Sequence, residues 1–244
     1  MKFFTHTALL VFVTFFLKVE VVSSQKINPD TWGAWYIYFF DGNVAGKNWG
    51  IQGDIQHRTW NGFDDMEQFL ARGGFYYKAP KSKAQFTLGY ATITTGEFGS
   101  GKKTSHENRI YQEFLFPENP LPRVFLTHRI RIEQRWVDNQ KFRTRYRYFI
   151  AVTVPLNKPD LSKGAIYIQG TNAVFINGEK NIGNGKKVEL FDRDRIYGAF
   201  GYSISNNLKI QVGAMRQITD TWAKNQVQIS LHHKFQLGKE ASGD

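Results

Sequence analysis

The sequence predicts an all-β protein: an antiparallel transmembrane β-barrel of ten to twelve strands, with twelve favoured. Three observations lead to this prediction. Polar and apolar residues alternate through long segments, the longest segments carry arginine along one face, and aromatic residues make up 16% of the chain. A strand that crosses a membrane within a barrel needs about ten residues, apolar towards the lipid and polar towards the lumen.

The segment from His106 to Leu156 shows the clearest alternation. Successive side chains on a strand point to opposite faces, and six arginines of this segment fall on shared faces of two runs, namely Arg129, Arg131, Arg135, Arg143, Arg145 and Arg147. Apolar residues such as Ile130 and Ile132 occupy the opposite face. Each run is about fifteen residues long, whereas strands of soluble proteins average roughly five or six. A hairpin of this length with one charged face favours a membrane barrel.

Amphipathic segments separated by turn signals fill the rest of the chain. In order, the expected strands are 32–40, 47–60, 67–78, 84–95, 106–116, the two strands of the arginine hairpin, 165–177, 191–205, 208–219 and 223–235. Clusters of Gly, Pro, Asn and Asp separate them. We expect residues 117–122 to form a rigid turn, and 96–105 and 178–187 to be exposed loops.

This pattern contains eleven candidate strands, whereas single-chain bacterial barrels have an even number. If loop 178–187 faces outwards and the short turn at Asn206-Asn207 inwards, the first strand begins on the wrong side of the membrane. We therefore expect either a missed strand or a segment 32–40 that lies outside the wall, and we favour twelve strands over ten.

The two ends of the chain differ from the strands between them. Residues 1–24 have the features of a cleaved signal peptide, with Lys2, an apolar run over 8–17 and small residues before Gln25. The apolar run is too short for a transmembrane helix, which needs about twenty residues. We expect a single barrel domain over 25–237 and a polar tail over 238–244, with the mature protein in the bacterial outer membrane.

The composition excludes several classes of site. The chain has no cysteine, so it forms neither disulfides nor a thiolate metal site. The formal net charge of +11 suits a nucleic-acid-binding protein, but the arginines alternate with apolar residues, which argues against nucleic acid as a partner. We expect no metal and no cofactor.

The polar faces predict a set of ion pairs inside the barrel. Arginine pairs bidentately with carboxylates and keeps its charge where water is scarce. The expected ladder consists of Glu107, Arg109, Glu113, Arg129, Arg131, Glu133, Arg135, Arg143, Arg145, Arg147, Asp192 and Asp194. Such a ladder either fills and rigidifies the lumen or leaves an excess of arginine that selects anionic solutes.

Candidate catalytic pairs of serine and histidine are weak. Ser105 and His106 are sequence neighbours, so their side chains diverge on a strand, and the same holds for His232 and His233. His128 lies on the apolar face, where a lone histidine is more often an interfacial residue than a base. We do not expect an enzyme.

Several phrases of the sequence resemble the domain-of-unknown-function 2490 family. They are His106-Glu107-Asn108-Arg109, Gln112-Glu113, Arg129 to Arg135, Arg143 to Arg147, Phe191 to Arg195, Tyr197-Gly198, Gly201-Tyr202 and Asn225-Gln226-Val227. The resemblance implies an exported bacterial protein that forms an outer-membrane β-barrel, and it brings no established activity. At Ala173, relatives usually carry an acidic residue nearby, so its absence here implies a more basic lumen.

Three functional hypotheses follow from these patterns. The first is a narrow, porin-like channel for small solutes with an arginine-rich, anion-preferring lumen. The second is a barrel plugged by its own ion pairs that acts through its extracellular loops in a structural or assembly role. The third is a soluble lipocalin-like carrier, which the strand length disfavours. The expected partners are outer-membrane lipid, the outer-membrane assembly machinery and a small anionic solute.

Overall fold

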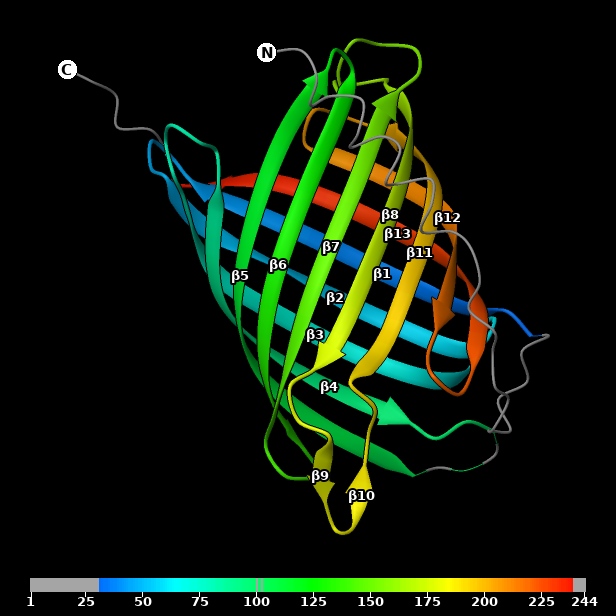
Figure 1. Ribbon diagram of the computed structural model, residues 1–244. Helices are drawn as coiled ribbons and strands as arrows, with labels where there is room; N and C mark the ends of the chain where they lie inside the picture. The colour runs from blue at the N-terminus through cyan, green and yellow to red at the C-terminus, as the bar shows by residue number, and fades with distance from the viewer. Residues whose placement is uncertain (1–30, 100, 102, 239–244) are drawn as a thin grey trace, which may run out of the picture.

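The computed structural model describes residues 31–99, 101 and 103–238, and they form a closed β-barrel of eleven strands (Figure 1). Around the wall the strand order is β1-β13-β12-β11-β8-β7-β6-β5-β4-β3-β2, so most neighbours in space are neighbours in sequence. The expected signal peptide, 1–24, and the tail beyond residue 238 lie outside the described residues. Among the described residues, no helix has the length and hydropathy that a membrane span requires.

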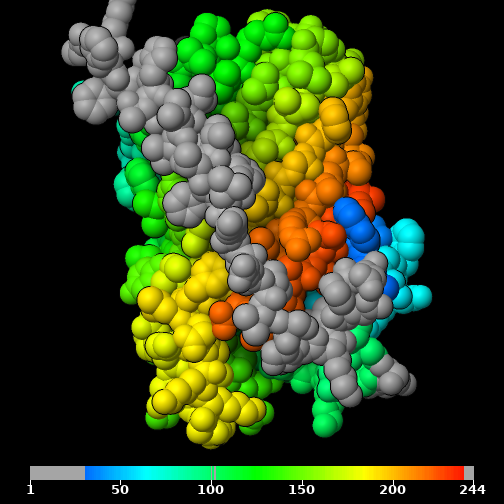
Figure 2. All heavy atoms as spheres, turned by 45° about the vertical axis from the view of Figure 1, so that its right-hand side comes forward, coloured from blue at the N-terminus to red at the C-terminus, as the bar shows by residue number. Residues whose placement is uncertain are grey.

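The strands of the wall are eleven to eighteen residues long. Their bounds are Gly33–Val44 (β1), Trp49–Asn61 (β2), Asp64–Lys78 (β3), Gln85–Gly96 (β4), Thr104–Leu121 (β5), Val124–Val137 (β6), Arg143–Pro155 (β7), Ile166–Asn177 (β8), Phe191–Ser203 (β11), Leu208–Ile218 (β12) and Ala223–Leu237 (β13). A separate hairpin of Asn181–Gly183 (β9) and Lys186–Lys187 (β10) extends beyond one end of the wall, where it appears in yellow in Figure 2.

The barrel closes through a parallel pair, and this corrects the expected strand number. All other neighbouring strands of the wall are antiparallel, whereas β1 pairs with β13 in parallel from Gly33 opposite Gln226 to Val44 opposite Leu237. A parallel seam is what allows an odd number of strands to close. The expectation of twelve strands was therefore wrong, and segment 32–40 belongs to the wall. Gly33 and Leu237 lie at opposite ends of the barrel, which removes the conflict over where the first strand begins.

Two expected connections also differ from the structure. Residues 117–121 continue β5, with Pro117 opposite Thr127 on β6, and the turn is confined to Pro122 and Arg123. Proline has no backbone N–H, so it fits a strand at a position where no hydrogen bond to the neighbouring strand has to be donated. Segment 178–187 contains the β9–β10 hairpin, which is anchored to the β6–β7 turn by the Lys141 N–H bond to the Ile182 carbonyl at 2.8 Å.

The wall separates polar from apolar side chains in the opposite sense to a soluble barrel. Charged residues such as Arg131, Glu133 and Arg145 are buried inside it. Large apolar side chains are exposed on the outside of the strands: Ile55, Phe69, Phe75, Tyr77, Phe86, Leu88, Tyr90, Ile110, Ile130, Tyr146, Tyr148, Ile166, Ile168, Phe200, Tyr202, Ile210, Val212 and Ile229. Exposed apolar area this extensive is unusual for a soluble monomer.

Two interior tyrosines pack on glycines of the neighbouring strand. Tyr111 of β5 lies opposite Gly89 of β4, and Tyr167 of β8 lies opposite Gly201 of β11. A Cβ atom added at either glycine would overlap the tyrosine ring. Glycine in a strand commonly marks such a close approach, and here it allows two large rings to lie flat against the wall and remain buried.

We predict that Gly201→Ala lowers the free energy of unfolding by about 1–3 kcal/mol, because the new methyl group displaces the buried Tyr167 ring. Gly170→Ala is the matched control, since a Cβ atom there meets no atom within 4 Å. Urea unfolding of the refolded protein in lipid vesicles measures both variants. Equal losses for the two would contradict the packing described.

Candidate functional site

The barrel encloses one large cavity of about 1010 Å³. Its lining extends from Lys83 and Glu118, close to the turns at one end, to Thr95 and Gln140, close to the connections at the other. Six carboxylates line it, against eleven arginines: Arg58, Arg72, Arg109, Arg129, Arg131, Arg135, Arg143, Arg145, Arg147, Arg193 and Arg195. The interior described by the structure therefore carries more positive than negative side chains.

The register of β5, β6 and β7 sets the order of charges on one wall of this cavity. Three rows of residues lie directly opposite one another, namely Glu113–Arg131–Arg147, Tyr111–Glu133–Arg145 and Arg109–Arg135–Arg143. Like charges directly opposite on neighbouring strands repel, and Arg131 faces Arg147 in this way. The rows hold together because carboxylates pair both within a row and diagonally between rows.

Glu107 is the carboxylate with the most complete arginine contacts. It accepts hydrogen bonds from Arg109 Nε at 2.6 Å and Nη2 at 2.8 Å. It also accepts from Arg135 Nε at 2.5 Å and Nη2 at 3.0 Å. Bidentate pairs of this kind are the stronger charge-assisted hydrogen bonds, and they join β5 to β6 at their buried faces.

Glu133 lies among three arginines. Arg145 Nε donates to its Oε2 at 2.7 Å, while Arg109 Nη1 and Arg131 Nη1 lie 3.7 and 3.8 Å from its Oε1. Arg145 also reaches Asp192 of β11, with Nη1 3.0 Å from Oδ2. Arg145 thus links carboxylates from two different strands.

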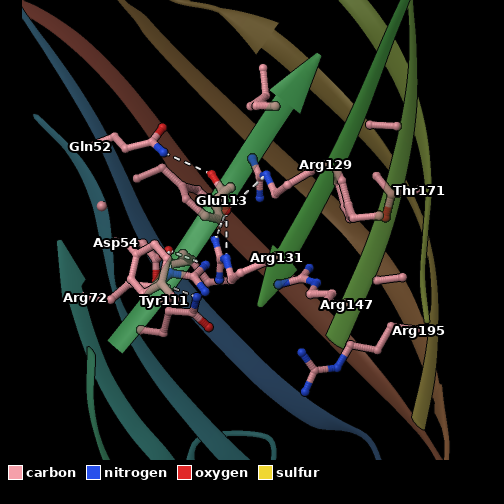
Figure 3. Close-up of a pocket in the computed structure, with 18 of the residues that line it drawn as sticks. Gln52, Asp54, Arg72, Tyr111, Glu113, Arg129, Arg131, Arg147, Thr171 and Arg195 are labelled. Carbon is pink, nitrogen blue, oxygen red and sulfur yellow. Dashed lines mark hydrogen bonds and ion pairs between the residues drawn. The ribbon is translucent and has the colours of Figure 1, made fainter. Parts of the chain in front are cut away.

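Glu113 and Asp54 complete the ion-pair ladder, as shown in Figure 3. Arg131 Nε donates to Glu113 Oε2 at 2.7 Å, and Arg129 Nε lies 3.6 Å from the same oxygen. Close to this group, Arg72 Nε of β3 donates to Asp54 Oδ1 of β2 at 2.5 Å. We use the term ion-pair ladder for Asp54, Glu107, Glu113, Glu133, Asp192 and the arginines that contact them.

A second group of arginines stacks on aromatic rings. Guanidinium carbons and ring centroids alternate across several strands, in the order Arg58–Trp35 3.7 Å, Trp35–Arg195 4.7 Å, Arg195–Phe175 5.0 Å, Phe175–Arg147 4.7 Å, Arg147–Phe149 5.4 Å and Phe149–Arg129 5.0 Å. We call this the arginine–aromatic stack. Cation–π contacts stabilise by about 2 kcal/mol when the groups are desolvated, and they do not use the N–H groups of the guanidinium.

Ten of the twelve sequence-predicted residues line the cavity, and Asp192 joins them at its edge. Asp194 does not belong to the ladder, which corrects the sequence prediction. Buried Tyr197 and Ala199 set the inward face of β11, so Asp194 faces outwards and accepts a hydrogen bond from Asn172 Nδ2 at 2.8 Å. A register shift between Phe191 and Arg193 lets Asp192 point inwards instead.

The sequence analysis missed several charged residues that the fold brings to the cavity, among them Asp54, Arg58, Arg72, Arg193 and Arg195. A signal existed for two of them, because Asp54 and Arg58 alternate with apolar residues on 47–60. Arg72 is followed by two glycines, and glycine does not indicate which face of a strand is buried. Arg195 shares its face of β11 with buried Tyr197 and Ala199, so it was missed because the sequence analysis assigned the inward face to Asp192 and Asp194.

The histidines considered as bases occupy two different environments. His128 lies on the outside, with Nδ1 2.7 Å from the hydroxyl of Tyr148. His232 lines the cavity, with Nε2 3.0 Å from Ser230 Oγ and 3.1 Å from Gln211 Oε1. Activation of a serine also requires a group that orients the base. The ring of His232 instead stacks on Phe39, with ring centroids 4.6 Å apart. The contacts of His232 give no triad.

The chain belongs to the family described as proteins of unknown function, DUF2490, which matches residues 32–228. This range covers all of the wall except the last residues of β13. No curated protein matches the chain. No solved structure matches it either.

We predict that Glu133→Gln destabilises the barrel by about 3–5 kcal/mol, because it leaves buried arginines without their shared carboxylate. Glu189→Gln is the control. Its partner Lys180 lies 2.9 Å away, but both side chains are more than half exposed, so the expected change is at most about 1 kcal/mol. Urea unfolding in lipid vesicles reports both. A loss at Glu133 as small as that at Glu189 would show that the ladder does not stabilise the fold.

Proposed function

We propose that this chain is a bacterial outer-membrane β-barrel that lets small anionic solutes pass through its arginine-lined interior. The observation that carries the proposal is the cavity, whose lining reaches from one end of the barrel to the other with eleven arginines and six carboxylates. Rings of arginine or lysine favour anions in pores because the fixed positive charge attracts them and repels cations.

The outer surface supports the membrane location. Aliphatic and aromatic side chains such as Leu88, Ile130 and Phe200 are each at least half exposed on the outside of the wall. In water such a surface favours aggregation, whereas in lipid it faces a matching solvent. The closed wall also leaves no strand edge unpaired, which a spanning β-structure requires. The proposed partners are outer-membrane lipid and the machinery that assembles such barrels.

The ion-pair ladder supports a second candidate function. Arg145 connects Glu133 to Asp192, and the contacts of Glu107 and Glu113 bring further guanidinium groups into the interior. If these groups close the passage, the barrel acts as a plugged scaffold through its loops. A lipocalin-like carrier receives less support, because its interior would be apolar, whereas Arg131, Glu133 and Arg135 are buried inside this barrel.

We predict that the refolded protein forms anion-selective conductance steps in planar bilayers under a salt gradient. Arg147→Glu is expected to shift the reversal potential towards cation preference, because it reverses a charge on the cavity wall that has no carboxylate partner among the described residues. Arg123→Glu is the matched control, since Arg123 lies in the β5–β6 turn and does not line the cavity. Inserted but silent protein would favour the plugged barrel, and cation selectivity would refute the anion conduit.

We predict that Ile130→Arg lowers the free energy of unfolding in lipid vesicles by about 2–4 kcal/mol, the cost of an arginine at the lipid face near the bilayer centre. Ile130 is half exposed on the outer face of β6. Ile130→Val should cost less than about 1 kcal/mol. The wild-type protein should also be extracted from cells only with detergent. Recovery in the soluble periplasmic fraction, with Ile130→Arg folding normally in water, would contradict the membrane location.

A further inference from the structure

Two neighbouring arginines of the cavity lack any carboxylate partner among the described residues. Arg147 and Arg195 stack on the same ring, with guanidinium carbons 4.7 and 5.0 Å from the centroid of Phe175. Among the described residues, the buried Nε of Arg147 has no hydrogen-bond acceptor. Arg195 donates from Nε to Gln217 Oε1 at 2.7 Å. Figure 3 shows both side chains projecting into the cavity.

The register explains why these two positions lack a counter-charge. Arg147 shares its row with Arg131, and Arg131 contacts Glu113 and Glu133. Arg195 lies directly opposite Ala173 of β8. The side chain of Ala173 is a methyl group buried in the cavity wall, so it provides no counter-charge.

Buried positive charge without a counter-ion is costly, and a bound anion offsets that cost. The planar guanidinium pairs with the oxygens of a carboxylate, sulfonate or phosphate in a bidentate manner. Stacking on Phe175 occupies only ring faces, and Arg195 Nε is used by Gln217, so the Nη groups of Arg147 and Arg195 are the donors left for an oxyanion. The two arginines therefore form a site for an acidic head group.

An apolar wall lies directly beside this site. Trp35, Ile37, Tyr197, Ala199 and Met215 form a buried cluster, and Phe39 packs against it. Most of the cluster lines the same cavity as the two arginines, and Trp35 itself contacts Arg195 at 4.7 Å. A simple inorganic anion gains nothing from contact with this apolar wall. An anion with an apolar body would remove both surfaces from water.

We infer that the cavity binds an amphipathic anion. Its oxyanion head lies at Arg147 and Arg195, and its apolar body lies along the apolar wall that includes Trp35 and Met215. This inference rests on the proposed function for the route by which the ligand enters, and it specifies the class of solute. The site is also a point of slow passage, because a ligand held at both ends leaves the cavity less readily than a small anion.

The test is calorimetric titration of octanoate into the full-length barrel in lipid nanodiscs, with empty nanodiscs subtracted. Octanoate should bind at least about a hundredfold more tightly than acetate, because its additional methylene groups leave water. Neutral 1-octanol at the same concentrations should give no saturable binding beyond that of the empty nanodiscs. Equal affinity for octanoate and acetate would overturn the amphipathic site.

Variants locate the site. Ala173→Asp places a carboxylate opposite Arg195 and should abolish octanoate binding, whereas Ala151→Asp adds the same charge elsewhere on the cavity wall and should preserve it. Arg195→Gln removes the cation without adding a charge and should weaken binding at least about tenfold. Met215→Gln keeps the size of the side chain but makes the apolar wall polar, and should weaken octanoate more than acetate.

The outcomes distinguish this inference from the proposed conduit. Full octanoate binding in Ala173→Asp or Arg195→Gln would overturn the site, even if the wild-type protein still shows anion-selective conductance. Saturable octanoate binding that these variants abolish would establish the site, even if the barrel is electrically silent and the conduit proposal fails.

Discussion

The pairing of buried arginine with buried carboxylate across neighbouring strands is the interaction on which this barrel depends. A closed wall buries whatever faces inwards, and here β5, β6 and β7 direct arginine and glutamate there. Ion pairs in such a setting stabilise only when their geometry satisfies both partners, because desolvation of each charge is expensive. The carboxylate of Glu107 is satisfied by four hydrogen bonds from two arginines. The outer face is then free to be apolar.

The cavity is lined by more arginines than carboxylates, and this excess of positive charge makes the interior suited to anions. Four of the six cavity carboxylates lie on β5 and β6, but seven of the eleven arginines lie on β5, β6 and β7. Arg58, Arg147 and Arg195 stack on aromatic rings and have no carboxylate partner among the described residues. The interior therefore keeps an excess of positive charge, and Arg195 lies beside an apolar wall. The proposed conduit and the inferred amphipathic anion site both follow from this excess.

Much of the fold could be predicted from the sequence because alternation is a local signal. The eleven candidate segments correspond to the eleven strands of the wall, and most of the ladder residues follow from which face Ile130 and Arg131 occupy. The rest depends on non-local geometry. The parallel β1–β13 seam leaves no trace in either strand alone, and the β11 register shift turns Asp192 inwards and leaves Asp194 outside. The contact of Arg195 with Trp35 of β1 likewise depends on a strand distant in the sequence.

The most direct test of the central claim, a charged interior within an apolar exterior in lipid, is a spin-label scan of β6. The natural chain has no cysteine, so single cysteines can be placed at each position from 126 to 135 and labelled after refolding in vesicles. Accessibility to lipid-soluble oxygen should alternate with a period of two, with maxima at even positions such as 130 and minima at odd positions such as 131. Low oxygen accessibility at every position, or maxima at the odd positions, would contradict the account.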